Sequence, residues 1–320
     1  MKRLMRLRAS THLRDLCSET EFTTSQLVQP LFAVEGIDSQ ESIPGLKGTT
    51  RQTPEELLKQ VEGDLERGVR HFLLFPVPGS KALSQFSHNF AAGTIQSLTS
   101  RFGADMHLWV DTCLCSYTEH GHCGVLHDDG RVNLEATLRE LAGAAKAYAE
   151  AGAQGISPSD MMDGRTAAIR EALDGAGLER VPIMSYSTKF ASNFYGPFRH
   201  AADSAPQFGD RKAYQIDVRN RTDALAASLR CAEEGADLLM VKPGMTAIDL
   251  VEPIRRATGK PVGAYQVSGE YAGLALQEEQ GLVNFEQALL ETWHVFRRAG
   301  CSYIITYGAR YARQLGVPVR

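Results

Sequence analysis

The 320-residue sequence has no long hydrophobic run, no strong excess of one charge sign and no low-complexity tract. No stretch approaches the roughly 18 apolar residues that a membrane-spanning helix needs. The net charge of −4 argues against a dedicated nucleic-acid-binding protein. With 43% hydrophobic and 22% charged residues, the composition excludes a disordered chain or a fibre. A globular protein is therefore predicted.

Cysteine is sparse, with six residues in the whole chain. Cys17, Cys231 and Cys301 lie far apart and are typical of small apolar residues in a core. We expect no disulfide, because no secretory signal is recognisable and cytosolic thiols stay reduced. The expected location is cytoplasmic.

Acidic residues are missing from the N-terminus before Asp15, and residues 1–14 are basic. An organelle transit peptide has this composition, but a clear cleavage-like break is missing. We therefore expect residues 1–26 to form an arm that packs on a neighbouring subunit. Residues 27–320 are expected to form a single catalytic domain.

A helical stretch that ends at glycine and leads into a short apolar strand recurs four times, at Gly68, Gly152, Gly235 and Gly300. Glycine ends a helix readily because it adopts the left-handed conformation at no steric cost. Short apolar runs are typical of parallel strands buried on both faces. Eight strands are predicted, at 27–34, 71–77, 106–111, 155–157, 181–185, 237–242, 261–266 and 302–307. Because no GxGxxG turn follows the first strand, the pattern favours a (β/α)8 TIM barrel over a doubly wound sheet.

Polar side chains gather at the C-terminal ends of the predicted strands, where barrel enzymes carry their active sites. The residues at or just after these ends are Asp111, Asp160, Lys189, Lys242, Ser268 and Tyr307. The sequence therefore predicts one reactive rim.

Cys113, Cys115 and Cys123 lie within eleven residues, directly after the third predicted strand. Zinc binds thiolates well and has no redox chemistry of its own. Three ligands leave one coordination position open for water or substrate, whereas His120 or His122 as a fourth ligand would close a structural site. Buried thiols that bind nothing are a third interpretation. The glycines in this segment indicate a loop, which favours a metal site over core packing.

Lys242 extends a hydrophobic strand, so its amine is expected in a partly dry barrel mouth. Desolvation lowers the pKa of a lysine, and a second cation such as Lys189 lowers it further. A neutral amine that faces a carbonyl substrate forms a Schiff base. The alternative is a lysine whose head reaches water. Two lysines on adjacent strands beside a thiolate cluster favour the Schiff-base interpretation.

A long segment without periodicity follows Lys189 and extends to Gln215. Loops beyond about 12–15 residues are uncommon in compact domains unless they are lids or binding loops. Arg199 and Arg211 in this segment are suited to clamp a carboxylate through two hydrogen bonds each. A lid is therefore predicted, with a solvated surface loop as the alternative.

Four motifs together resemble a known family. They are Asp-Thr-Cys-Leu-Cys…His-Gly-His-Cys-Gly at 111–124, Ser-Tyr-Ser-Thr-Lys-Phe-Ala-Ser at 185–192, Met-Val-Lys-Pro-Gly at 240–244 and Tyr-Gln-Val-Ser-Gly-Glu-Tyr at 265–271. The combination is highly specific and resembles the porphobilinogen synthase (5-aminolevulinate dehydratase) family over nearly the whole chain. This resemblance implies a lyase that condenses two 5-aminolevulinate molecules asymmetrically to porphobilinogen, with loss of two waters, in heme biosynthesis.

The resemblance also implies a role for individual residues. Lys189 and Lys242 match the two Schiff-base lysines of the family. The matches to its catalytic zinc ligands are Cys113, Cys115 and Cys123. The matches to its substrate-binding groups are Arg199, Arg211 and Gln215 in the lid for one substrate, and Ser268 and Tyr307 for the carboxylate of the other. The family is typically a homo-octamer whose N-terminal arms wrap neighbouring subunits.

Three alternatives stay open at this point. Asp111 and Asp160 could relay protons or orient amines, but they could equally make structural hydrogen bonds. A barrel of the class I aldolase type would use one lysine and need no metal, so dependence on zinc distinguishes it. A zinc protein without catalytic activity would not explain two rim lysines, and it would form no borohydride-trappable adduct with a keto acid.

Overall fold

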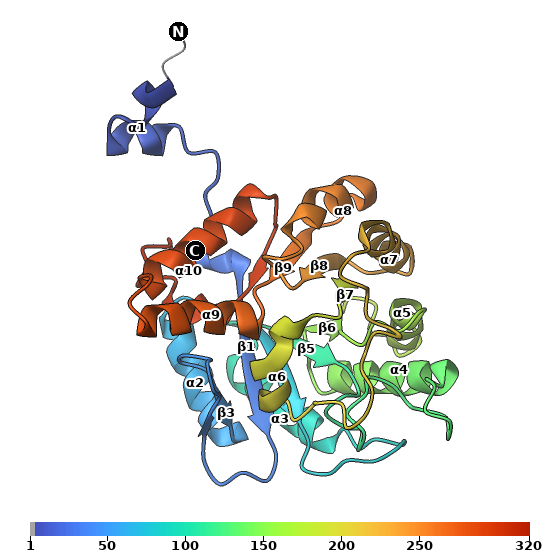
Figure 1. The fold of residues 1–320 in the computed structure, drawn as a ribbon. Coiled ribbons are helices and arrows are strands. Elements are labelled where there is room, and N and C mark those ends of the chain that lie inside the picture. Colours follow the sequence, from blue (N-terminus) through green and yellow to red (C-terminus); the bar gives the residue numbers. More distant parts are fainter. Residues whose placement is uncertain (1–3) are drawn as a thin grey trace.

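The computed structural model describes residues 4–320, so the first three residues of the predicted arm lie outside the described range. Eight parallel strands form a barrel with helices on its outside (Figure 1). These strands are β1 (Leu27–Val34), β4 (His71–Val77), β5 (His107–Thr112), β6 (Gly155–Pro158), β7 (Met184–Lys189), β8 (Leu238–Lys242), β9 (Val262–Tyr265) and β10 (Ile304–Ile305). The predicted (β/α)8 barrel is confirmed.

The barrel strands pair in the order β6-β5-β4-β1-β10-β9-β8-β7, which leaves a seam between β6 and β7. Within residues 4–320, backbone pairing across this seam consists of an isolated bridge between Ile156 and Ile183. Its hydrogen bond runs from Ile156 N to the carbonyl of Pro182 at 3.0 Å. The Ser157 hydroxyl adds a bond to the carbonyl of Met184 at 2.8 Å. Strands β6 and β7 therefore share the fewest backbone-paired residues of any neighbouring pair in the barrel.

The helices alternate with the strands, as the glycine pattern predicts. They are α1 (Thr11–Leu16), α2 (Pro54–Glu66), α3 (Asn89–Phe102), α4 (Leu134–Glu150), α5 (Arg165–Asp174), α6 (Gly196–Ala201), α7 (Arg221–Glu233), α8 (Val251–Thr258), α9 (Ser268–Glu279) and α10 (Phe285–Arg298). Gly68, Gly152, Gly235 and Gly300 all have positive φ, between +90° and +102°. Each glycine therefore ends its helix in the conformation that favours glycine.

Three details differ from the sequence-based expectations. Strand β7 extends to Lys189, whereas 181–185 was predicted, and its pairing with β8 is irregular between Ser185 and Thr188. The predicted loop after Lys189 contains the short helix α6. A hairpin of β2 (Glu41–Ser42) and β3 (Thr50–Gln52) extends the sheet beside β1. All three elements are too short or too polar to produce a clear hydrophobic period.

The core consists of two large apolar clusters, and strands β1, β4 and β5 contribute residues to both. Strand β1 is buried along its whole length, and the rings of Phe32 and Phe75 stack at 5.2 Å inside the barrel. Within residues 4–320, no helix is both long and apolar enough to cross a membrane.

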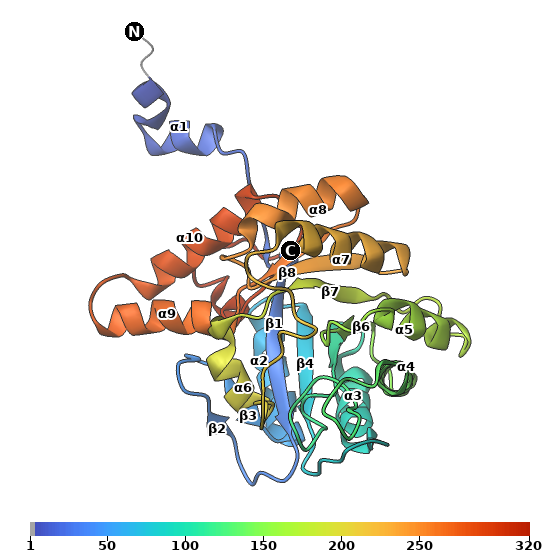
Figure 2. The same ribbon diagram turned by 45° about the vertical axis from the view of Figure 1, so that its right-hand side comes forward.

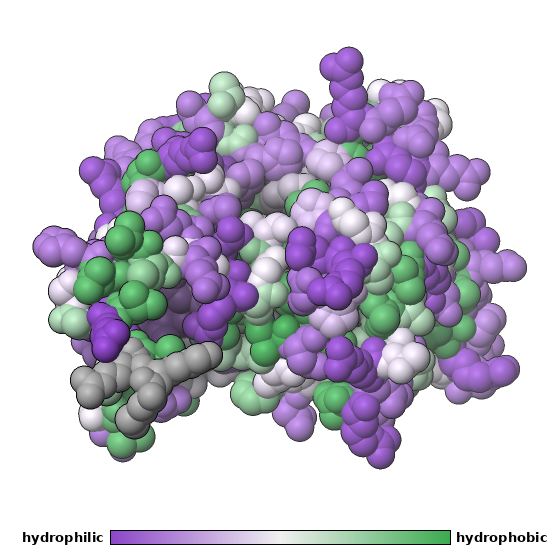
Figure 3. Space-filling model, turned by 90° about the horizontal axis from the view of Figure 1, so that it is seen from above, coloured by the Kyte–Doolittle hydropathy of each residue, from purple (hydrophilic) through white to green (hydrophobic). Residues whose placement is uncertain are grey.

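The N-terminal segment projects away from the barrel, with α1 at its outer part (Figures 1 and 2). Its short helix η1 (Leu4–Arg8) and α1 contain no buried residue. Met5 and Leu16 are 77% and 81% exposed. Figure 3 looks down on this side of the molecule and shows hydrophobic side chains gathered on the projecting segment. The segment thus carries apolar surface that the barrel of the same chain does not cover.

Candidate active site

Lys189 and Lys242 end two adjacent strands and lie directly opposite each other in the parallel register of β7 and β8. Their exposed fractions are 5% and 3%. Both amines lie over the ring of Tyr186, with Nζ at 5.6 Å and 4.9 Å from the ring centroid respectively. The two lysines that the sequence predicted on one rim are thus neighbours in one buried site.

Aromatic rings surround the amine of Lys242. Besides Tyr186, the rings of Tyr195, Phe198 and Tyr265 have centroids 5.2, 4.8 and 4.3 Å from its Nζ. Burial lowers the pKa of Lys242 well below its ordinary value, and the nearby charge of Lys189 lowers it further. The site therefore favours the neutral, nucleophilic form of this amine.

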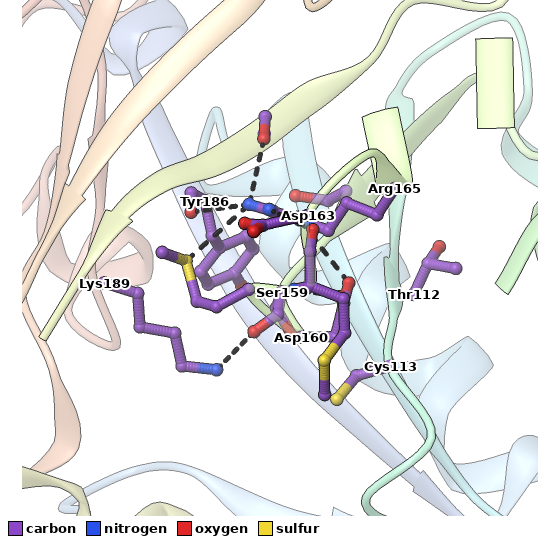
Figure 4. A network of polar contacts seen from close by, with 12 residues as sticks. Thr112, Cys113, Ser159, Asp160, Asp163, Arg165, Tyr186 and Lys189 are labelled. Atoms are coloured by element: carbon purple, nitrogen blue, oxygen red, sulfur yellow. Dashed lines mark hydrogen bonds and ion pairs between the residues drawn. The ribbon is translucent and has the colours of Figure 1, made fainter. Parts of the chain in front are cut away.

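The amine of Lys189 is held by the loop that follows β6. Its Nζ donates a hydrogen bond to the carbonyl of Ser159 at 2.5 Å (Figure 4). In the same loop, Asp160 is fully buried and its Oδ1 accepts a bond from the backbone N–H of Met162 at 2.7 Å. Burial raises the pKa of Asp160. Asp160 therefore accepts a backbone hydrogen bond within its own loop.

Asp111 lies near the C-terminal end of β5, on the same rim as the two lysines. Its Oδ1 is buried and has no hydrogen-bond partner within the described chain. Burial, together with the charge of Cys115, raises the pKa of the Asp111 carboxyl to about 7. A carboxyl group with this pKa is able to give up or take a proton near neutral pH.

The three predicted metal ligands converge. The Sγ atoms of Cys113, Cys115 and Cys123 all lie within 4.8 Å of one another, and all three residues are buried. The Cys113 thiol lies 3.4 Å from Cys115 Sγ, and its hydrogen bond lowers the pKa of the Cys115 thiol. A compact set of three thiols fits a metal that prefers sulfur.

The two histidines of this loop do not join the thiols. His122 places Nδ1 at 3.1 Å from the hydroxyl of Tyr214 and Nε2 at 3.1 Å from the carbonyl of Phe208, so both ring nitrogens have protein partners. The Nδ1 of His120 accepts from the backbone N–H of His122 at 3.1 Å. Among residues 4–320, the metal-ligand cluster contains the three cysteines and neither histidine. The geometry thus gives no support to a closed four-ligand site.

The segment of residues 202–216, called the lid below, covers the thiol cluster. Arg211 Nη2 donates to the carbonyl of Gly121 at 2.8 Å, and the backbone N–H of Gln207 donates to the carbonyl of His120 at 3.0 Å. With the Tyr214 contact, these bonds fasten the lid to the loop that carries the thiols. This segment therefore packs directly against the loop that carries the three predicted metal ligands.

Comparison with known proteins decides the family. A family model described as delta-aminolevulinic acid dehydratase matches residues 1–315. The protein of that name from Helicobacter pylori (strain J99) is 43% identical over 321 residues, covering 98% of both chains. Its counterpart from Bacillus subtilis (strain 168) is 39% identical over 311 residues, covering 96% of this chain and 95% of the relative. The chain belongs to the delta-aminolevulinic acid dehydratase family.

A solved structure agrees with this assignment. The Toxoplasma gondii delta-aminolevulinic acid dehydratase (porphobilinogen synthase), in complex with the reaction product porphobilinogen, matches with a TM-score of 0.94 and 38% identity over 98% of this chain and 91% of that chain. The chain is therefore a lyase of the porphobilinogen synthase class. The family assigns it the formation of porphobilinogen from 5-aminolevulinate in heme biosynthesis.

The residues that the dehydratase resemblance assigned to substrate binding lie at two places. Arg199 is on α6, and the side-chain amide of Gln215 is buried with neither polar atom bonded within the described chain. On the other side, Ser268 Oγ accepts from the backbone N–H of Phe198 at 3.0 Å. The Tyr307 hydroxyl lies 3.1 Å from that of Tyr265. These residues therefore come from different elements: Arg199 from α6, Gln215 from the lid, Ser268 from α9 and Tyr307 from the segment after β10.

Two residues of the site, Arg165 and Tyr186, were not predicted from the sequence. Arg165 is fully buried beside Asp160, and Tyr186 lies beneath both lysine amines. The arginine follows a glycine at a helix start, where a charged residue usually marks a solvated surface. The tyrosine stands three residues before Lys189, so strict strand alternation would put the two side chains on opposite faces. The irregular pairing between Ser185 and Thr188 brings both to one site, and no sequence pattern indicates that irregularity.

Proposed function

We propose that the chain condenses two 5-aminolevulinate molecules to porphobilinogen, and that Lys189 and Lys242 each form a Schiff base with the ketone of one substrate. The observation that carries this proposal is the pair of buried amines over one tyrosine ring, one of them with a lowered pKa. Two amines at one site match a reaction that joins two identical ketones. A single-lysine aldolase mechanism would leave the second amine without a role.

The surroundings of Lys242 suit each step at that residue. The neutral amine attacks the ketone carbon and its N–H proton passes to the oxygen. A second proton, from an acid in the site, releases this hydroxyl as water and leaves a cationic iminium. The faces of Tyr265, Phe198 and the other rings exclude water and favour this cation. Loss of a proton from the adjacent carbon then gives an enamine, the carbon nucleophile for the new C–C bond. Asp111, with its pKa near 7, is a candidate for moving these protons.

The same proposal assigns the metal ligands and the groups that bind the substrate carboxylates. Cys113, Cys115 and Cys123 would hold zinc, because three clustered thiols suit it and leave a position open. When bound, zinc supplies Lewis acidity to a carbonyl or activates a water. The proposed carboxylate-binding groups are Arg199, Arg211 and Gln215 for one substrate, and Ser268 and Tyr307 for the other.

We further propose that the chain works as a cytoplasmic homo-octamer in which residues 1–26 pack on a neighbour. The exposed apolar side chains of the projecting segment support the packing role. All six cysteines are free thiols, which accords with a reducing compartment.

A pyrrole assay tests the proposed function. The zinc-loaded protein is incubated with 5-aminolevulinate, and the pyrrole product is detected by its colour reaction. Lys189→Ala and Lys242→Ala should each nearly abolish product and leave circular dichroism unchanged, since neither amine belongs to the apolar core. Lys146→Ala, an exposed position on α4, is the matched control. Substantial turnover in both active-site variants would contradict the Schiff-base proposal.

A further inference from the structure

We propose that Arg165 is a positioning residue for Lys189, because it closes the barrel at the β6–β7 seam and fixes the carbonyl that holds the Lys189 amine. This inference deepens the proposed function and rests on it. It begins with the short ladder of the seam, where the bridge between Ile156 and Ile183 lies before the ends of β6 and β7 that form the rim. At the rim, some other contact must hold β6 and β7 together.

Arg165 supplies that contact. It is the first residue of α5, follows Gly164 with φ +79°, and turns its guanidinium inward (Figure 4). Its Nη1 donates to the carbonyl of Met162 at 3.0 Å, on the β6 side of the seam. Its Nη2 donates to the carbonyl of Tyr186 at 3.0 Å, on the β7 side. One planar side chain therefore bridges the seam where the strands do not pair.

The location of this charge is costly for stability. Arg165 and Asp160 are both fully buried, and Arg165 Nε lies 3.5 Å from Asp160 Oδ2. Removing two charges from water often costs more than their attraction returns. A positive charge in the first helical turn is also opposed by the helix dipole. Stability alone would therefore favour an apolar residue, so the arginine serves a different need.

That need is the placement of Lys189. The loop that Arg165 holds through Met162 and Asp160 presents the carbonyl of Ser159, which accepts from Lys189 Nζ. Arg165 also donates to the carbonyl of Tyr186 on β7, and the ring of Tyr186 lies beneath both amines. Lys242 depends less on this arrangement, because three further rings from other elements surround its amine. Loss of the guanidinium should therefore affect Lys189 more than Lys242.

Arg165→Lys is the test variant. It keeps a positive charge beside Asp160, but it lacks the planar fork through which Nη1 and Nη2 donate to the carbonyls of Met162 and Tyr186. Borohydride is added with 5-aminolevulinate, and the reduced adducts at Lys189 and Lys242 are quantified by peptide mass spectrometry. We expect the Lys189 adduct to fall about tenfold or more, as a small misplacement does, while the Lys242 adduct is retained. An undiminished Lys189 adduct, or an equal loss at both lysines, would overturn the proposal.

Arg170→Lys is the matched control. Arg170 lies on the same helix and donates to the carbonyl of Val181 at 2.8 Å, in the segment that leads from α5 into β7. It should leave both adducts at the wild-type level even if the melting temperature falls. If Arg165→Lys does not fold, Arg165→Met combined with Asp160→Asn removes both charges together, and the same adduct ratio decides.

A substrate-free measurement separates this inference from the proposed function. Competitive acetylation reports the reactivity of each amine without 5-aminolevulinate. Arg165→Lys should change the reactivity of Lys189 relative to Lys242 several-fold, because the amine loses its fixed carbonyl partner, and Arg170→Lys should not. Wild-type protein that traps no adduct at all would refute the Schiff-base proposal, and the acetylation ratio would still decide the role of Arg165.

Discussion

At the scale of single residues, Lys242 owes its expected reactivity to its neighbours. A lysine in water is almost fully protonated at neutral pH. Here burial lowers its pKa, and the charge of Lys189 adds to the effect. The aromatic faces around Nζ then favour the cationic adduct once it has formed. The two effects act at different stages and do not oppose each other.

The contribution of Lys189 can be measured with Lys189→Met. Removing the second cation raises the pKa of Lys242 towards its ordinary value, so a smaller fraction of the amine is neutral at any given pH. The pH profile of borohydride trapping at Lys242, measured between about pH 6 and 10, should therefore move to higher pH. Lys146→Met should leave the profile in place. An unmoved or acid-shifted profile would show that Lys189 does not set the protonation of Lys242.

At the scale of elements, the lid and the thiol-bearing loop are joined by bonds that a single change can remove. Tyr214→Phe deletes the hydroxyl that contacts His122 Nδ1 at 3.1 Å and accepts from the backbone N–H of Cys123 at 3.3 Å. A net hydrogen bond contributes about 1 kcal/mol. We expect a rise of about fivefold in KM for 5-aminolevulinate and faster proteolysis within residues 202–216. Tyr311→Phe is the control, and equal effects from both variants would contradict this role.

The three thiols form their own cluster, whereas other residues of the same loop, such as Leu114, belong to a large apolar cluster of the core. Cys113, Cys115 and Cys123 form a small cluster with Met162, separate from the two large apolar clusters of the barrel. Chelation of zinc should therefore stop pyrrole formation but lower the melting temperature only modestly. Calorimetry of the chelated and reloaded protein measures both. Collapse of the whole fold on chelation would instead indicate a structural site.

Some helices and strands could be predicted from the sequence and others could not. Strands β1 and β4 were predicted at their observed bounds, because continuous apolar runs identify buried parallel strands. Strand β7 was placed too early, because the hydroxyl side chains of Ser185, Ser187 and Thr188 interrupt its apolar run. Helix α6 has six residues, too few to establish a period of 3.6.

The residues of the site were likewise predicted only in part from the sequence. The lysines and the thiols were found because their chemistry and their place after strands are local properties of the sequence. The ring cluster around Lys242 was not found, because Tyr195, Phe198 and Tyr265 come from three separate elements that meet only in the fold. Arg165 was missed because no local pattern distinguishes a buried arginine from a solvated one.

At the scale of the whole molecule, the projecting N-terminal segment makes assembly testable. Its residues 4–16 have exposed apolar side chains and lie away from the barrel (Figure 2). Deleting residues 1–16 should convert the proposed octamer into smaller particles in sedimentation velocity, while the circular dichroism of the barrel persists. A full-length chain with Met5→Ser and Leu16→Ser keeps the length and tests whether apolar contact is responsible. An unchanged sedimentation coefficient in the truncated protein would refute the arm's role.

The fastening of the lid to the thiol-bearing loop has a consequence for the two ligands of the proposed site. The carbonyl of Gly121 accepts a hydrogen bond from Arg211. The loop proposed to bind the metal and the lid proposed to bind the substrate are therefore in direct contact. Equilibrium coupling between two ligands is reciprocal. If the metal steadies the closed lid, bound substrate must in turn raise the affinity of the site for the metal. A working enzyme would then keep its zinc at chelator concentrations that strip an idle one.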